Sequence, residues 1–285
     1  MKNIITILVV LVLIFNYTTS SAQNNQVNND KKFWPMSTNS AEARESFTQA
    51  LDYLWNARHE EYKGKLEQAL NEDPVFFLAY ANAAIFKYIN EQNKSNEMGR
   101  SSEVAKSREK GELSNKLDKA LGLPQDKLTA PEKIMREVLV NIKENNTNKF
   151  RENIDQMVNQ HPDIIQSYEF AKAMSRFILN DPELAHKYVQ TTVEKFPNHG
   201  PAWNDLGYYH MEKGNMDKAE EAFNQYLKVS PNEANAHDSY GEFCMKKGKY
   251  DEARMHYEKA VEMGMTASRE NAEKAREMAQ GADVE

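Results

Sequence analysis

Two adjacent stretches of 34 residues decide the fold of this chain: GPAWNDLGYYHMEKGNMDKAEEAFNQYLKVSPNE at 200–233 and ANAHDSYGEFCMKKGKYDEARMHYEKAVEMGMTA at 234–267. When the second is aligned with the first, seven positions are identical. The identical pairs are Ala202/Ala236, Gly207/Gly241, Met211/Met245, Lys213/Lys247, Gly214/Gly248, Asp217/Asp251 and Ala219/Ala253. A repeat at this period is typical of proteins that stack one supersecondary unit on the next.

The shared positions predict that each unit is a pair of helices. Gly207 is small, so a second helix can approach the first closely at this point. Gly214 ends the first helix, where left-handed backbone is needed. Ala219 is again small, at the crossing of the two helices, and Pro231 terminates the second helix.

These residues resemble the tetratricopeptide repeat family. In 200–233 the residues that match the family motif are Trp203, Leu206, Gly207, Ala219, Phe223 and Pro231. The next unit keeps Gly241, Ala253, Tyr257 and Ala260, but has His237 and Met265 in place of the tryptophan and the proline. A unit at 166–199 keeps Ala173, Ala185 and Pro197, and Asp181-Pro182 starts its second helix. The resemblance implies an all-α fold, an α-solenoid of stacked antiparallel helix pairs in a right-handed superhelix.

Degenerate helix pairs are expected upstream, over residues 40–162. Ser40–Pro74 forms one pair, and a second begins near Tyr80 and ends with a helix over Glu103–Leu121. A polar loop at Asn90–Ser102 is an insertion in that second pair. A capping box at Thr129–Glu132 opens the next pair. With the three units in 163–267, we expect six pairs, closed by a polar capping helix and tail at 268–285.

The N-terminus is predicted to be a signal peptide over residues 1–22. Lys2 precedes an apolar run at Ile4–Phe15, which as a helix is about 18 Å long, against about 30 Å for a bilayer core. Ser20 and Ala22 fit the small-x-small pattern of signal peptidase sites, which predicts cleavage after Ala22. The ending resembles secretory signals of Gram-negative bacteria, so we expect a periplasmic or outer-surface protein. An uncleaved membrane anchor and a eukaryotic secreted protein are the alternatives.

A flexible polar tether is expected at residues 23–39, because this stretch has few apolar residues to bury. Phe33, Trp34 and Pro35 interrupt it and are the residues that would dock back on the first helices.

The chain has 285 residues, one cysteine and a formal charge of −7. These values exclude an internal disulfide and argue against a general nucleic-acid binder.

The family resemblance implies that partners bind a concave groove lined by the first helix of each unit. Helical phase nominates the groove residues Phe170, Met174, Phe177, Asn204, Tyr208, Met211, Asp238, Glu242 and Met245. The first three form an apolar stripe that is also typical of a core. Tyr208, Asp238 and Glu242 suit a neutral or basic extended segment, or a helix, and have the wrong sign for a C-terminal carboxylate.

No catalytic, cofactor or metal site is predicted. The seven histidines form no His-x-x-x-His pair, and glycine-rich phosphate loops and nucleophile motifs are absent from the sequence. Cys244 is expected to be a small buried residue. The sequence therefore favours a non-catalytic scaffold or adaptor of the cell envelope that binds a protein or peptide, with no membrane span after cleavage. The alternatives are capture of a glycan, peptidoglycan fragment or lipid in the same groove, and an enzyme with a scattered site.

Overall fold

The structure is a computed structural model that describes residues 32–97, 115–144, 146 and 149–282. Within these ranges the regular structure is entirely helical, which confirms the predicted all-α class. The helices are α2 (Ala41–Trp55), α3 (His59–Glu72), α4 (Phe77–Glu97), α6 (Ala130–Lys143), α7 (Phe150–Gln160), α8 (Ile165–Phe177), α9 (Pro182–Lys195), α10 (Gly200–Glu212), α11 (Met216–Val229), α12 (Ala234–Lys246), α13 (Tyr250–Glu262) and α14 (Ser268–Ala282). Residues 115–121 are helical as well.

The helices pack in pairs along the chain, and the three predicted units correspond to α8–α9, α10–α11 and α12–α13. Gly214 and Gly248 lie just after the first helix of their units with φ of +75° and +74°, a conformation that glycine adopts without strain. The side chain of Asp181 accepts a hydrogen bond from the Leu184 N–H and caps α9. The turn and cap residues that define the period therefore act as the sequence predicts.

The two helices of a unit cross at their glycine and alanine positions. A Cβ atom added to Gly207 would lie 2.6 Å from the ring of Phe223, which is fully buried. At Gly241 the same atom would lie 3.0 Å from the ring of Tyr257. The aromatic ring of the second helix thus fills the space that the missing side chain leaves on the first.

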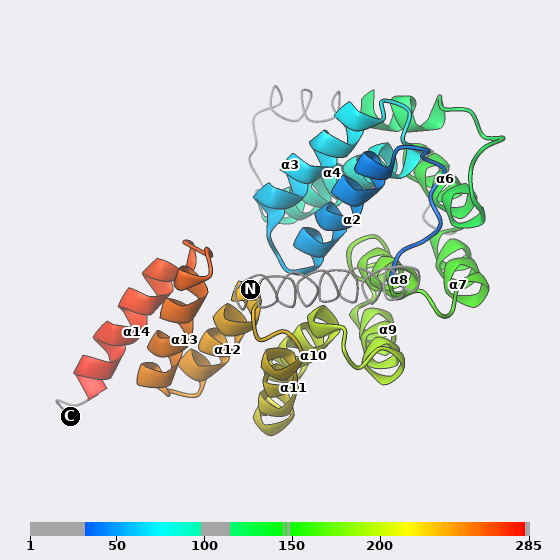
Figure 1. Ribbon diagram of the computed structural model, residues 1–285. Helices are drawn as coiled ribbons and strands as arrows, with labels where there is room; N and C mark the ends of the chain where they lie inside the picture. Colours follow the sequence, from blue (N-terminus) through cyan, green and yellow to red (C-terminus); the bar gives the residue numbers. More distant parts are fainter. Residues whose placement is uncertain (1–31, 98–114, 145, 147–148, 283–285) are drawn as a thin grey trace, which may run out of the picture.

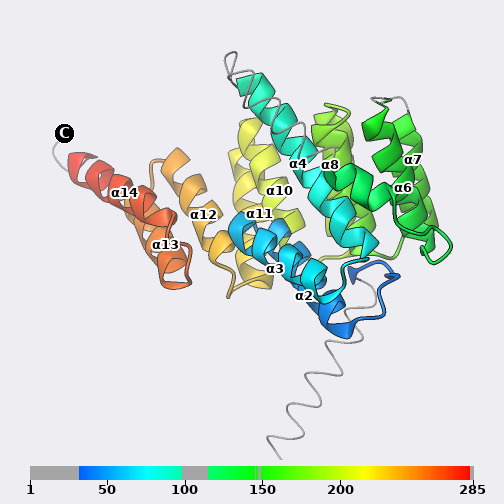
Figure 2. The same cartoon turned by 90° about the horizontal axis from the view of Figure 1, so that it is seen from above.

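The pairs from α6 to α14 follow one another along an arc, and the α2–α3 pair lies on its inner side (Figure 1). Seen from above, the α2–α3 pair overlaps the α10–α11 pair (Figure 2). Two contacts made by the C-terminal end of α2 confirm this placement. The Tyr226 hydroxyl of α11 donates to Asn56 Oδ1 at 2.9 Å, and the rings of Trp55 and His199 meet edge to face at 5.4 Å.

Two predictions about irregular segments are wrong in the part of the chain that the structure describes. The tether predicted for 23–39 does not extend over 32–39, because Phe33 and Trp34 are buried against the helices. The loop predicted to begin at Asn90 is still helical to Glu97, because α4 continues through it. The signal peptide, residues 23–31, the rest of the predicted loop at 98–102 and residues 103–114 of the predicted helix lie outside the described residues.

The buried apolar side chains form two clusters with a polar boundary between them. One cluster runs from Phe33 to Tyr188, and the other from Met211 to Ala275. The boundary falls where the unit at 166–199 meets the unit at 200–233. None of the helices in the described part of the chain is both long and apolar enough to cross a membrane.

Candidate functional site: the inner face of the first helices

The first helices of successive units lie in a row, and polar contacts tie each one to the next. Lys172 Nζ on α8 lies 2.6 Å from Asp205 Oδ2 on α10. The Tyr208 hydroxyl on α10 donates to Glu242 Oε2 on α12 at 2.8 Å, across one 34-residue period. Burial and the Glu242 carboxylate both raise the pKa of Tyr208 above its ordinary value, so the phenol stays protonated as the donor. Two of the predicted groove residues therefore face one another between neighbouring repeats.

The row continues to the capping helix through a third predicted residue. Ser268, the first residue of α14, donates its hydroxyl to Asp238 Oδ1 on α12 at 2.5 Å. Burial raises the pKa of Asp238 above its ordinary value, while this hydrogen bond opposes that shift. Asn204 and Met245 are half-buried on the same face. By helical spacing these residues share one face of α10 and α12, which we call the open section: Asn204, Tyr208, Asp238, Glu242 and Met245.

Three of the predicted groove residues are in the interior instead. Phe170 and Met211 are buried, and Met174 is only 1% exposed, so none of the three faces solvent. They belong to the apolar clusters, and the prediction that they line a groove is wrong. Phe177, at the end of α8, is 39% exposed and remains available for contact. Phe170 on α8 is buried because another part of the chain packs on it.

The covering segment is residues 33–38, which sequence reasoning placed in a tether. Trp34 is 2% exposed and packs edge to face on Phe170, with ring centroids 5.7 Å apart. Its indole Nε1 donates to Ser167 Oγ at 2.9 Å, and its main-chain N–H donates to Gln166 Oε1 at 2.9 Å. Phe33 stacks on Trp55 of α2 at 5.5 Å, as expected for docking on the first helices. The inner face of α8 is therefore occupied by the chain itself.

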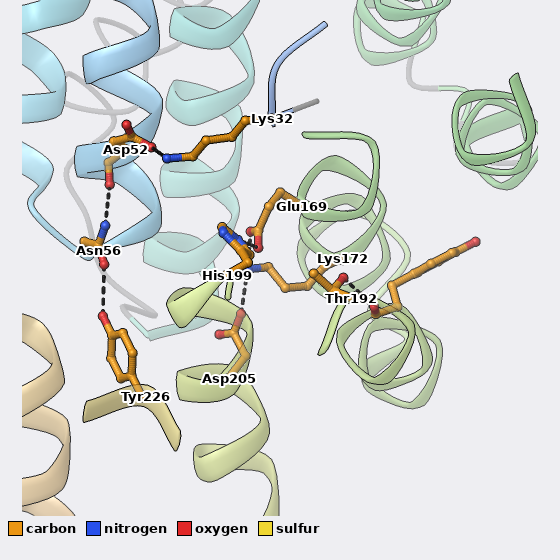
Figure 3. A network of polar contacts seen from close by, with 10 residues as sticks. Lys32, Asp52, Asn56, Glu169, Lys172, Thr192, His199, Asp205 and Tyr226 are labelled. Carbon is orange, nitrogen blue, oxygen red and sulfur yellow. Dashed lines mark hydrogen bonds and ion pairs between the residues drawn. The ribbon is translucent and has the colours of Figure 1, made fainter. Parts of the chain in front are cut away.

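A buried ionic network lies where α8 meets α10, at the boundary between the two apolar clusters (Figure 3). Glu169 accepts from Lys172 Nζ at 2.5 Å and lies 2.8 Å from His199 Nε2. Burial alone would raise the pKa of the Glu169 carboxyl, but the charges of Lys172 and His199 outweigh it and hold that pKa below its ordinary value. Asp205 is the second acid beside Lys172. Sequence reasoning missed this network, whose only local signal is an acid and a base three residues apart on α8.

The histidines do not assemble a metal site in the described ranges, where no group of three or more His, Cys, Asp or Glu side chains converges suitably for a metal ion. His237 and His256 do pair across α12 and α13, with their Nδ1 atoms 3.1 Å apart. Burial lowers the pKa of both rings. Cys244 is buried, and burial raises the pKa of its thiol to about 12, which leaves it a poor nucleophile.

The family match covers the repeats that the structure shows most regularly. The model of the tetratricopeptide repeat family matches residues 170–234 and 206–268. No curated protein matches the chain.

Solved structures of similar fold share little sequence with the chain. A thermophilic TPR protein of Thermus thermophilus, TTC0263, is 16% identical, with 82% of this chain and 98% of that chain covered and a TM-score of 0.43. A tetratricopeptide repeat protein of Parabacteroides merdae is 11% identical, with 83% and 100% covered and a TM-score of 0.44. PilW, a type IV pilus biogenesis factor, is 15% identical, with 86% and 94% covered and a TM-score of 0.33. The repeats matched at residues 170–268, which the paired helices α8–α13 form, are similar to the tetratricopeptide repeat family.

Proposed function

We propose that the chain is a non-catalytic scaffold that binds a protein partner through the open section of α10 and α12. Tetratricopeptide repeats generally serve protein–protein interaction and are typically non-catalytic. The observation that supports this location is a contrast within the row of first helices. The predicted contact residues on α8 are mostly covered by the chain itself, whereas Tyr208, Glu242 and Met245 are half-buried or exposed.

The chemistry of the open section favours a neutral or basic partner segment, either extended or helical. Glu242 is exposed and Asp238 is half-buried, so the section carries two acids. Asn204 adds a half-buried polar side chain. Like-charged acidic segments would be repelled.

The proposed place of action is the envelope of a Gram-negative bacterium, reached by cleavage of residues 1–22. The support is in the sequence: a short apolar run followed by small residues ending at Ala22. Mass spectrometry of the N-terminus of the protein from native cells tests this step. We expect a chain that begins at Gln23 in the periplasmic or outer-surface fraction. A chain retained in the cytoplasm with an intact Met1 terminus would contradict it.

Capture of the partner by crosslinking in native cells tests the scaffold function. The informative variant is Glu242→Lys, which reverses an exposed charge in the open section. Its matched control is Glu194→Lys, the same change at an exposed position on α9, a second helix. We expect the parent and the control to capture the same protein and Glu242→Lys to lose it. Equal capture by all three proteins, or capture by none, would contradict the proposal.

A further inference from the structure

Residues 33–38 are buried although they form no regular structure. Trp34 and Thr38 are both buried, yet no residue between Phe33 and Thr38 belongs to a helix or strand. Among the described residues, no main-chain group of this segment bonds to another main-chain group. An extended segment with this burial needs another source of hydrogen bonds for its main chain.

Side chains of the helical body supply those hydrogen bonds. The Trp34 N–H donates to Gln166, as described above. The Pro35 carbonyl accepts from Thr129 Oγ1 at 2.9 Å, and the Ser37 N–H donates to Glu132 Oε1 at 3.0 Å. Recognition of main-chain groups by side chains of a groove is how a helical protein holds an extended peptide, since a helix has no free main-chain edge to offer.

Two further hydrogen bonds involve side chains of the segment. Ser167 accepts from the indole of Trp34, and Glu132 accepts from the Ser37 hydroxyl at 2.9 Å. Glu132 is fully buried, and its other oxygen, Oε2, accepts from the Thr129 N–H at 2.8 Å. A segment without a hydroxyl at the position of Ser37 would leave Glu132 Oε1 with the main-chain N–H as its one donor from the segment, which costs a charge-assisted hydrogen bond. The site therefore selects an aromatic residue and, three residues later, a hydroxyl.

The site lies on the same face as the open section. Phe170, on which Trp34 packs, is one 34-residue period before Asn204 and two periods before Asp238. The segment thus occupies, on α8, the position that a partner would occupy on α10 and α12. Beside the segment lies an open cavity of about 920 Å³, lined by Phe33, Trp34 and the solvent-exposed side of α2. Solvent therefore reaches one side of the segment.

We propose that this site, formed by α6 and α8 and closed by α2, is a second peptide-binding site of the scaffold, which residues 33–38 fill as an intramolecular ligand. Its external occupant is an extended partner segment with an aromatic residue and, three residues later, Ser or Thr. The inference rests on the proposed scaffold function, since the competing segment belongs to a protein partner. Release of Trp34 would open the α8 part of the row to that segment.

A labelled peptide with the sequence of residues 31–40 is the direct probe of the site. It is titrated by fluorescence anisotropy into the parent and into Trp34→Ala, both purified as full chains after export. We expect saturable binding to Trp34→Ala that is at least about tenfold tighter than to the parent, whose own segment competes at high effective concentration. The same peptide carrying Ser37→Ala should bind at least about fivefold more weakly, because Glu132 Oε1 loses one of its two donors. Ser167→Val in the Trp34→Ala chain should weaken binding at least about tenfold, because the Trp34 indole loses its acceptor.

Equal binding to the parent and Trp34→Ala, or no binding to either, would overturn the proposal. So would a dimer of Trp34→Ala that excludes the peptide, which would assign the site to a second copy. If Trp34→Ala fails to fold, a protease site inserted between Asn39 and Ser40 of the parent replaces it. After cleavage, exchange of the bound segment for labelled peptide supports the proposal, whereas retention without exchange or unfolding overturns it. Neither assay involves the open section, so failure here leaves the Glu242→Lys result as the separate test of the scaffold function.

Discussion

The hydroxyl of Tyr226 donates to Asn56 across 170 positions of sequence and joins the α2–α3 pair to the repeat array. Tyr226 is fully buried, and its oxygen also accepts from Asn235 Nδ2 at 3.2 Å. Tyr226→Phe and Asn56→Ala should each lower the free energy of unfolding by about 1 kcal/mol, the net contribution of one such hydrogen bond. A double-mutant cycle measured by urea unfolding should show coupling of about 0.5–1 kcal/mol between them. Strictly additive effects would contradict the contact.

The close approach of α10 and α11 makes Gly207 intolerant of any side chain. Gly207→Ala should destabilise the protein by about 1–3 kcal/mol, because its Cβ would have to displace the buried ring of Phe223. Gly64 is the matched control, since it lies on the exposed side of α3 with no atom within 4 Å of an added Cβ. Gly64→Ala should stabilise by up to about 1 kcal/mol through the higher helix propensity of alanine. Chemical denaturation measures both, and a Gly207→Ala variant as stable as the parent would refute the packing.

At the boundary between the two apolar clusters, the charge of Glu169 stabilises the largely buried Lys172. Glu169→Gln should destabilise by about 3 kcal/mol, because it removes one of the two acids beside the largely buried Lys172. Glu183→Gln, which breaks an exposed pair with Lys213, should have a much smaller effect. Since the folded-state pKa of Glu169 lies below its unfolded value of about 4.5, its contribution is present above that pH and is lost as the pH falls through the folded-state value. In the Glu169→Gln variant the free energy of unfolding should therefore decrease less as the pH is lowered below about 4.5. The same decrease in the variant and the parent would contradict the network.

The facing rings of His237 and His256 make the last unit sensitive to mild acid. Both histidines have a pKa below the ordinary value of 6.5, so the unfolded chain binds more protons there than the folded one. Their contribution to stability is complete above about pH 6.5 and is lost as the pH falls below it. The melting temperature should decrease as the pH is lowered from about 7 to about 5, and His256→Gln should make this decrease smaller. His59→Gln, at an exposed position on α3, is the control and should leave the fall unchanged.

The periodic part of the fold could be predicted from sequence because its determinants are local. Gly207, Gly214 and Asp181 act within their own unit, so a single 34-residue period shows their roles. The placement of α2–α3 inside the arc could not be predicted, because it depends on pairs such as Asn56 and Tyr226 that no period connects.

The candidate site was predicted only where no distant segment covers it. Helical phase put Tyr208 and Glu242 at equivalent positions of successive first helices, and the two side chains are in contact. It could not show that Phe170 and Met174 are buried, since the residue that covers Phe170, Trp34, comes from a segment more than 130 positions earlier. The polar composition of residues 23–39 predicts a tether, and within it only Phe33, Trp34 and Pro35 indicate a docked segment.

Photo-crosslinking in native cells tests the central claim most directly, that a partner binds the inner face of α10 and α12. A photoreactive phenylalanine analogue would replace Met245 on the inner face in one strain, and Met255, which is 56% exposed on the second helix α13, in another. The account predicts a specific protein adduct from position 245 and none from position 255. An adduct from position 255 with none from position 245 would place the partner on the opposite face and contradict the account.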